Sequence, residues 1–226
     1  MKGKIVLISG ANGGLGTDVT RTFLEAGATV IGVSRGSRRE DFSSANFSGY
    51  SADLTQAKAT RELVSQVVAK FGRIDVLVHV MGGFAAARID ETDDETWATM
   101  RDMNLSSAFY TAREVLKVMR RSGGGRLIAI GSLAAVEPHA ALGAYATFKS
   151  ALTMLYRTIA LENQDKRITA NVILPGTMDT PGNRAAMPDA NFARWVQPAD
   201  FAKVALVLAG DEGAQINGAL IPVGKD

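Results

Sequence analysis

The chain contains no cysteine, and this absence excludes disulfide bonds, thiolate catalysis and cysteine-ligated zinc together. Histidine is almost as scarce, since the chain has two, His79 and His139. A Ser-His-Asp triad or a histidine-based metal site would have to use one of them, and neither lies in an H-x-x-x-H or H-E-x-x-H spacing. We therefore expect no metal site.

Long apolar runs are also missing, because no stretch approaches the roughly 20 apolar residues that span a bilayer. The first four residues lead directly into an apolar segment and show no signal peptide. The net charge is only +2, and the one local basic group, formed by Arg35, Arg38 and Arg39, is too small for a nucleic-acid surface. These features predict a cytoplasmic protein that binds neither nucleic acid nor membrane.

The chain does contain a regular alternation of short apolar segments and helical patterns. Strands are expected at 4–9, 29–34, 47–52, 76–80, 126–130, 168–174 and 219–223, and helices at 14–26, 55–71, 94–119, 143–163 and 198–209. This alternation predicts a single doubly wound, Rossmann-type α/β domain over residues 1–226, with about seven parallel strands and helices on both faces. The long irregular stretch 177–197 is expected to form the substrate-binding loop.

The first strand ends in a glycine-rich turn, G-x-x-x-G-x-G, which opens directly into a helix. Such a turn brings a pyrophosphate close to the free N–H groups of the helix N-terminus. The alternative is a glycine-rich turn without a ligand, but the position after the first strand of a βαβ unit favours a dinucleotide. The cofactor-binding residues expected in this turn are Gly10, Asn12, Gly14, Leu15 and Gly16.

The second strand ends at Ser34-Arg35, where an acidic residue would bind the ribose hydroxyls of NAD. A guanidinium can bind a 2′-phosphate through two N–H groups, so the sequence favours NADP(H), with NAD(H) as the less favoured cofactor. The alternative for Arg35 is a solvated surface arginine. Asp53-Leu54, after the third strand, is placed to meet the adenine edge, and Asp53 is equally suited to cap the next helix.

Tyr145 and Lys149 are four residues apart on a predicted helix, so they share one face. A free tyrosine has a pKa of about 10, and a nearby ammonium would lower it, which would make Tyr145 an acid/base catalyst. Ser132 follows a strand at the edge where doubly wound folds bind ligands, and its hydroxyl would orient a substrate oxygen. The alternative is an ordinary helix surface pair.

Taken together, these motifs resemble those of the short-chain dehydrogenase/reductase family over essentially the whole chain. The residues that carry the resemblance are the glycine turn, Asp53-Leu54, Asn104, Ser132, Tyr145, Lys149, Asn171 and Pro175-Gly176. The resemblance implies hydride transfer between nicotinamide C4 and a carbonyl or alcohol carbon. It makes Tyr145 the acid/base, Ser132 the group that polarises the carbonyl, and Lys149 the group that binds the nicotinamide ribose and tunes Tyr145.

The resemblance assigns further roles along the chain. Asn104 would hold the water of a proton relay, or else be only a residue at a helix kink. Gly82 would allow close approach of the cofactor, and the backbone from Pro175 and Gly176 through Met178 to Thr180 would hold the nicotinamide carboxamide. His79 stands where the family usually has an asparagine, and we expect it to be structural.

A second, local similarity concerns residues 178–188, continuing to Trp195, together with residues 81–84, and it is to dihydropteridine reductase. Those enzymes generally lack the serine found here at Ser132 and prefer NADH, so the similarity indicates kinship without the pterin activity. Reduction of a C=N bond in a pterin-like ring therefore stays an alternative. A non-catalytic NADP(H)-sensing regulator is another, and the complete set of chemical residues argues against it.

The substrate is expected to be a small molecule, a ketone, aldehyde or cyclic compound, because the predicted pocket is mostly apolar. The predicted lining residues are Phe84, Glu137, His139, Leu142, Met187 and Trp195. For Met187 and Trp195 the alternative is anchoring of the loop, and for His139 it is a solvated loop position. Apolar residues of the two long helices, Val115, Leu116, Leu152, Leu155 and Tyr156, suggest a homodimer or homotetramer, or else packing within one subunit.

Overall fold

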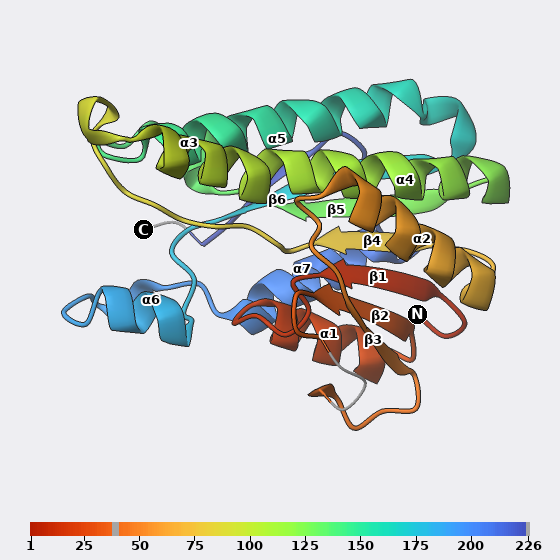
Figure 1. The fold of residues 1–226 in the computed structure, drawn as a ribbon. Helices are drawn as coiled ribbons and strands as arrows, with labels where there is room; N and C mark the ends of the chain where they lie inside the picture. The colour runs from red at the N-terminus through yellow and green to blue at the C-terminus, as the bar shows by residue number, and fades with distance from the viewer. Residues whose placement is uncertain (38–40, 225–226) are drawn as a thin grey trace.

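The computed structural model describes residues 1–37 and 41–224, so Arg38 and Arg39 of the basic group lie outside the described residues. The strands are β1 Ile5–Ser9, β2 Thr29–Ser34, β3 Phe47–Ser51, β4 Val76–His79, β5 Gly125–Ile130, β6 Ile168–Pro175 and β7 Leu220–Val223. They form one parallel sheet in the order β3-β2-β1-β4-β5-β6-β7, which confirms the predicted doubly wound domain (Figure 1).

Helices cover both faces of this sheet (Figure 1). The helices are α1 Gly16–Glu25, α2 Ala57–Phe71, α3 Asp94–Arg101, α4 Ser107–Ser122, α5 Gly143–Glu162, α6 Pro181–Ala186 and α7 Pro198–Ala209, with short 3-10 turns at Ile89–Glu91, Leu133–Ala135, Gln164–Lys166 and Phe192–Arg194. α1 and α7 pack together on one face, and α2, α4 and α5 lie over the other. The layers are those of a three-layer α/β/α domain.

Two apolar cores hold the layers together, one on each face of the sheet. Alternate residues of β1 belong to different cores: Leu7 packs beneath α2 and α4, whereas Val6 and Ile8 pack against α1 and α7. All eight residues of β6 are buried, as expected for a strand covered on both faces. Burial on both faces explains why the central strands β1, β4 and β6 are mostly apolar, whereas the edge strand β3 is not.

The predicted helix 94–119 is not one regular helix. The Asp93 side chain caps α3 by accepting a bond from the Thr96 N–H, but Asp102–Ser106 then form a π-helical turn before α4. In this turn the Ser107 N–H bonds to the Asp102 carbonyl, five residues back. A π turn of this kind adds a residue to the helix and often occurs at functional sites.

Most apolar residues that suggested subunit contacts belong to the core of the single chain. Val115, Leu152 and Tyr156 are fully buried, and Leu116 and Leu155 pack against the same cluster. The alternative of packing within one subunit is therefore the right one for these five residues. Other apolar side chains of α3, α4 and α5 are exposed instead, namely Trp97, Phe109, Met154 and Leu161.

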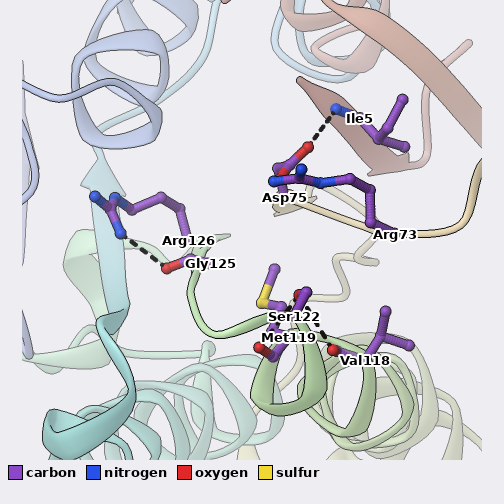
Figure 2. Close-up of polar contacts among 8 residues, drawn as sticks. All are labelled: Ile5, Arg73, Asp75, Val118, Met119, Ser122, Gly125 and Arg126. Atoms are coloured by element: carbon purple, nitrogen blue, oxygen red, sulfur yellow. Dashed lines mark hydrogen bonds and ion pairs between the residues drawn. The ribbon is translucent and has the colours of Figure 1, made fainter. Parts of the chain in front are cut away.

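Polar contacts hold together the end of the sheet where the strands begin (Figure 2). The Asp75 carboxylate, just before β4, accepts hydrogen bonds from the Arg73 guanidinium and, at 2.8 Å, from the Ile5 N–H. The Asp75 carbonyl also accepts a bond of 2.9 Å from the Arg126 N–H at the start of β5, and the Arg126 side chain donates to the neighbouring Gly125 carbonyl at 3.1 Å. These contacts fix the amino ends of three adjacent strands.

Residues 1–37 and 41–224 contain no helix that combines the length and the apolar character of a membrane span. Within the same residues, no group of three or more histidine, aspartate or glutamate side chains could hold a metal ion.

Candidate active site

The candidate site is a cavity of about 790 Å³ at the carboxyl ends of the strands. The strand order reverses at β1, whose neighbours are β2 and β4, and doubly wound sheets bind ligands at such a switch point. Of the predicted site residues, the cavity is lined by Leu15, Gly82, Phe84, Asn104, Ser132, Glu137, His139, Leu142, Tyr145, Lys149, Pro175, Gly176, Met178, Thr180 and Met187. Segments far apart in sequence therefore meet at one edge of the sheet.

The glycine turn lies beside this cavity and needs its glycines. Gly10 has a φ of 71°, and a Cβ on Gly16 would collide with the Gly10 carbonyl, so the chain can reverse this tightly only without those side chains. α1 then begins without a side-chain cap at Leu15, which leaves backbone N–H groups at its N-terminus free to meet a phosphate. Asn12 is exposed in the same turn.

Segment 177–197 reaches this turn from the other side of the cavity. A Cβ built on Gly14 would lie 3.2 Å from the Thr180 Cβ, so Thr180 packs directly over the glycine turn. The Thr180 hydroxyl also caps α6 by accepting a bond from the Asn183 N–H at 3.3 Å. The two predicted halves of the cofactor site are thus adjacent.

The ends of β2 and β3 lie side by side. The Ser51 hydroxyl donates to the Arg35 carbonyl at 2.7 Å, and the Arg35 side chain is exposed. The Asp53 carboxylate accepts bonds from the N–H and hydroxyl of Thr55, which is a local turn contact. Asp53 does not cap α2, because the helix begins at Ala57 with Gln56 as its N-cap and without a side-chain cap bond. The Leu54 side chain is buried in the core, which leaves only its backbone for a ligand.

Tyr145 and Ser132 meet at the floor of the cavity. Burial raises the pKa of Tyr145 above its ordinary value of 10, and a hydrogen bond with Ser132 acts in the opposite direction. The expected lowering by Lys149 is not found, because the loss of water on burial dominates. In this structure the phenol is protonated at neutral pH.

The Lys149 amine is almost fully buried and donates a hydrogen bond of 2.9 Å to the Ile130 carbonyl. Burial lowers the pKa of Lys149 to about 8. The amine therefore remains mainly charged at pH 7, in a place where charge is disfavoured. An ammonium with one protein acceptor has two further N–H groups to offer a ligand.

Asn104 lies in the π-helical turn, and its side chain is hydrogen-bonded to the backbone that follows β4. Its amide oxygen accepts from the Gly83 N–H at 3.2 Å, and its amide nitrogen donates to the carbonyls of Gly83 and Met100 at 3.1 and 3.0 Å. A Cβ on Gly82 would approach the Asn104 Oδ1 to 2.9 Å and the Lys149 Nζ to 3.3 Å. A larger residue at this position would have to displace the Asn104 amide from its place.

The substrate side of the cavity has a partly apolar wall. The Phe84 ring meets the Tyr145 ring edge-on with centroids 5.1 Å apart, and Leu142 and Met187 face the same space. His139 is exposed at the rim. Trp195 does not line the cavity, because its ring packs on Phe192 within segment 177–197, with centroids 4.7 Å apart.

Sequence reasoning missed several lining residues. These are Val80, Ile130, Leu133, Ala134, Ala140 and Asn183. Most are apolar residues next to a motif, and nothing in their type distinguishes them from core residues. Asn183 carried a weak signal, because it follows Thr180 by the three residues that separate a helix cap from the N–H group it binds.

Comparison with known proteins agrees with this geometry. Residues 4–191 match the family model described as short chain dehydrogenase. The chain is 32% identical to 2-dehydro-3-deoxy-D-gluconate 5-dehydrogenase of Pseudoalteromonas atlantica, over 99% of this chain and 95% of that protein. It is 30% identical to 3-oxoacyl-[acyl-carrier-protein] reductase FabG of Escherichia coli, over 98% and 96%.

A solved structure titled ElxO with NADP bound superposes with a TM-score of 0.92 at 27% identity, covering 99% of this chain and 97% of that one. The fold and site define a nucleotide-binding oxidoreductase of the doubly wound class. The chain belongs to the short-chain dehydrogenase/reductase family, whose members bind a nicotinamide cofactor.

Proposed function

We propose that the protein is an NADP(H)-dependent oxidoreductase that interconverts a carbonyl compound and an alcohol, with Tyr145 as the acid/base. The observation that carries this proposal is the meeting of Ser132, Tyr145 and Lys149 in one cavity, which Leu15 of the glycine turn also lines. A bound nicotinamide would supply or accept the hydride. The protein residues would hold the substrate oxygen and move its proton.

The state of Tyr145 favours the reducing direction. Because burial keeps its pKa above 10, the phenol holds its proton at pH 7 and can donate it to an oxygen that gains negative charge. Ser132, which is hydrogen-bonded to Tyr145, would donate to the same oxygen. The Lys149 ammonium would bind ribose hydroxyls, since its one protein acceptor leaves N–H groups available.

We propose roles for the other polar groups of the site. The N-terminus of α1 would bind the pyrophosphate, and the backbone from Pro175 to Thr180 would meet the carboxamide. Because the Asn104 side chain is occupied by Gly83 and Met100, any relay water would bind its main-chain carbonyl. For the 2′-phosphate we propose Arg35, which is exposed and has no ion-pair partner within residues 1–37 and 41–224.

The substrate would enter over Phe84, Leu142 and Met187, so we propose a ketone, aldehyde or cyclic substrate with limited charge. We also propose that the protein forms a homodimer or homotetramer through the exposed apolar residues of α3, α4 and α5. Trp97, Phe109, Met154 and Leu161 are each at least 40% exposed, which is unusual for side chains of their size.

A cofactor-oxidation screen tests the proposal. NADPH and NADH would each be offered with panels of ketones, aldehydes, quinones and quinonoid dihydropterin, and we expect turnover with a carbonyl compound.

Tyr145→Phe should lower kcat for that compound by roughly 100-fold or more, while the NADPH dissociation constant stays within about twofold of the wild-type value. Tyr50→Phe, on β3, is the matched control. Turnover of the dihydropterin alone would favour the pterin alternative, and full activity of Tyr145→Phe would refute the acid/base assignment.

A further inference from the structure

His79 stands at the end of β4, where its fully buried side chain makes hydrogen bonds in two directions. It is in register with Ser9 at the end of β1, and the Ser9 hydroxyl lies 3.1 Å from the His79 Nδ1. On its other side, the His79 Nε2 lies 3.3 Å from the hydroxyl of Ser107, the first residue of α4. All three side chains are 0% exposed, so each needs its polar atoms satisfied within the protein.

The direction of each hydrogen bond follows from counting protons. The Ser9 oxygen accepts from the N–H groups of Val80 and Met81 at 3.0 and 3.1 Å, which occupies its lone pairs. Its single proton must therefore point to Nδ1 of His79, and Nδ1 carries no hydrogen. The imidazole is then the neutral tautomer with hydrogen on Nε2, which donates to the Ser107 hydroxyl.

The chain of bonds ends in the π-helical turn. The Ser107 hydroxyl, having accepted from His79, donates to the Met103 carbonyl at 2.9 Å. Met103 immediately precedes Asn104, and Val80 and Met81 immediately precede the two glycines that Asn104 and Lys149 approach. The network thus joins both backbone segments that must be aligned for Asn104 to bind Gly83.

A charged imidazole would not serve here. Burial, reinforced by the nearby Lys149 ammonium, lowers the pKa of His79 to about 3. An aspartate would bury a negative charge at a comparable cost. A leucine would leave the Ser9 proton without an acceptor and would remove the donor to the Ser107 hydroxyl, although both hydroxyls would keep their bonds to the backbone.

We propose that His79 is a positioning residue: its neutral Nε2–H tautomer connects the ends of β1 and β4 to the π-helical turn and so holds Asn104 against the Gly83 backbone. This inference rests on the proposed function for its effect on turnover. His79 itself touches neither substrate nor cofactor. Its contribution is the alignment of the residues that do, and small displacements of such groups can cost about 100-fold in rate.

The first test does not depend on activity. Nitrogen-15 NMR of the histidine-labelled protein at pH 7 should show His79 as the neutral tautomer with hydrogen on Nε2. Ser107→Ala should change the Nε2 shift and lower the hydrogen-exchange protection of the Gly83 amide by at least about tenfold. The Nδ1–H tautomer, or unchanged Gly83 protection in Ser107→Ala, would overturn the proposal even if no carbonyl substrate is found.

The second test uses turnover. We expect Ser107→Ala and His79→Leu to lower kcat by about tenfold or more while KM and the NADPH dissociation constant stay within about twofold. Thr111→Val is the matched control, because it removes a buried hydroxyl of α4 that bonds only the Ser107 carbonyl. Because the His79→Leu protein could be unfolded, the outcome is judged on Ser107→Ala. In a double-mutant cycle, Asn104→Ala should make the Ser107→Ala loss much smaller, and additive losses would overturn the link.

Discussion

At the scale of single residues, the buried charge of Lys149 lowers the stability of the folded protein, although we expect this amine to bind the cofactor. Its pKa is depressed to about 8 in the fold, against 10.5 in the unfolded chain, so the unfolded state binds the proton more tightly. The cost of burying the charge is fully present below pH 8 and disappears above pH 10.5. Between those values the folded protein gains stability from this residue as the pH rises.

We therefore expect Lys149→Met to raise the melting temperature at pH 7 and to abolish turnover. The difference from the wild type should shrink as the pH approaches 10.5, which thermal unfolding at several pH values would measure. Lys58→Met, on the exposed face of α2, is the control and should show neither effect. A lower melting temperature for Lys149→Met at pH 7 would contradict this account.

Arg35 is the residue on which the choice of cofactor depends. Arg35→Asp should weaken NADPH binding by at least about tenfold and leave NADH binding within about threefold, because a carboxylate repels a 2′-phosphate and accepts from ribose hydroxyls. Fluorescence titration with each cofactor measures both constants. Arg61→Asp, on α2, makes the same charge change away from the site. Equal losses for the two cofactors would remove the NADP assignment.

The residue types of the site were predictable from sequence, but their electrostatic states were not. Spacing was enough to bring Tyr145 and Lys149 onto one wall. Whether the pKa of Tyr145 is raised or lowered depends on how deeply the phenol is buried, and a four-residue spacing does not reveal that burial. In the same way, the replacement of an asparagine by His79 was visible, but its two serine partners come from other elements.

At the scale of elements, segment 177–197 is stabilised by the ion pair between Arg184 and Asp179, and neighbouring side chains contact both members of this pair. Arg184 of α6 donates to both Asp179 carboxylate oxygens, at 2.5 and 2.8 Å, and Gln197 donates to the same carboxylate at 3.0 Å. These bonds, chiefly the one from Arg184, lower the pKa of Asp179 to about 2. The Arg184 guanidinium also lies over the Phe192 ring, 4.7 Å from its centre.

Arg184→Gln should release α6 while leaving the sheet intact. We expect KM for the carbonyl substrate to rise by about threefold or more, and proteolysis within 177–197 to accelerate, with little change in melting temperature. The matched control is Arg194→Gln, an exposed arginine of the same segment. Because Asp179 keeps its charge down to about pH 2, the segment should stay ordered through mildly acidic pH. Equal behaviour of the two variants would show that the ion pair does not order the segment.

Element boundaries were largely predictable, with two exceptions. No helix was expected within 177–197, where α6 forms at Pro181–Ala186. β-branched runs and three-to-four spacing located all seven strands and the main helices within a few residues. The π-helical turn at Asp102–Ser106 was not predicted, because its apolar spacing resembles that of an ordinary helix. It is set by tertiary contacts, namely the bonds of Asn104 to Gly83 and of Ser107 to His79.

At the scale of the whole molecule, the number of strands and their doubly wound arrangement followed from alternation and crossover handedness. The exposed apolar residues could not be predicted from the sequence, since the residues proposed there as subunit contacts are core residues. Which side of a helix faces a neighbouring layer depends on where that layer lies. The exposed residues of α3, α4 and α5 are known only from the structure.

These exposed residues make the assembly testable. Met154 and Leu161 are seven residues apart on α5, so they share one face, and they are 59% and 69% exposed. We expect Met154→Asp to convert a dimer or tetramer into a smaller species, as measured by size-exclusion chromatography with light scattering. Ser65→Asp, on the exposed face of α2, should leave the mass unchanged. A wild-type monomer at micromolar concentration would refute the proposed assembly.

The added residue of the π-helical turn has a geometric consequence for the layer above the sheet. Each residue turns an α-helix by about 100°, so one extra residue rotates everything before it relative to everything after it. α3 can therefore place Trp97 against Phe148 of α5, with ring centroids 4.7 Å apart, while α4 turns its apolar side towards α2. If one residue were deleted from this turn, α3 and α4 could no longer both keep their orientations, so either the contact of α3 with α5 or that of α4 with α2 would be lost.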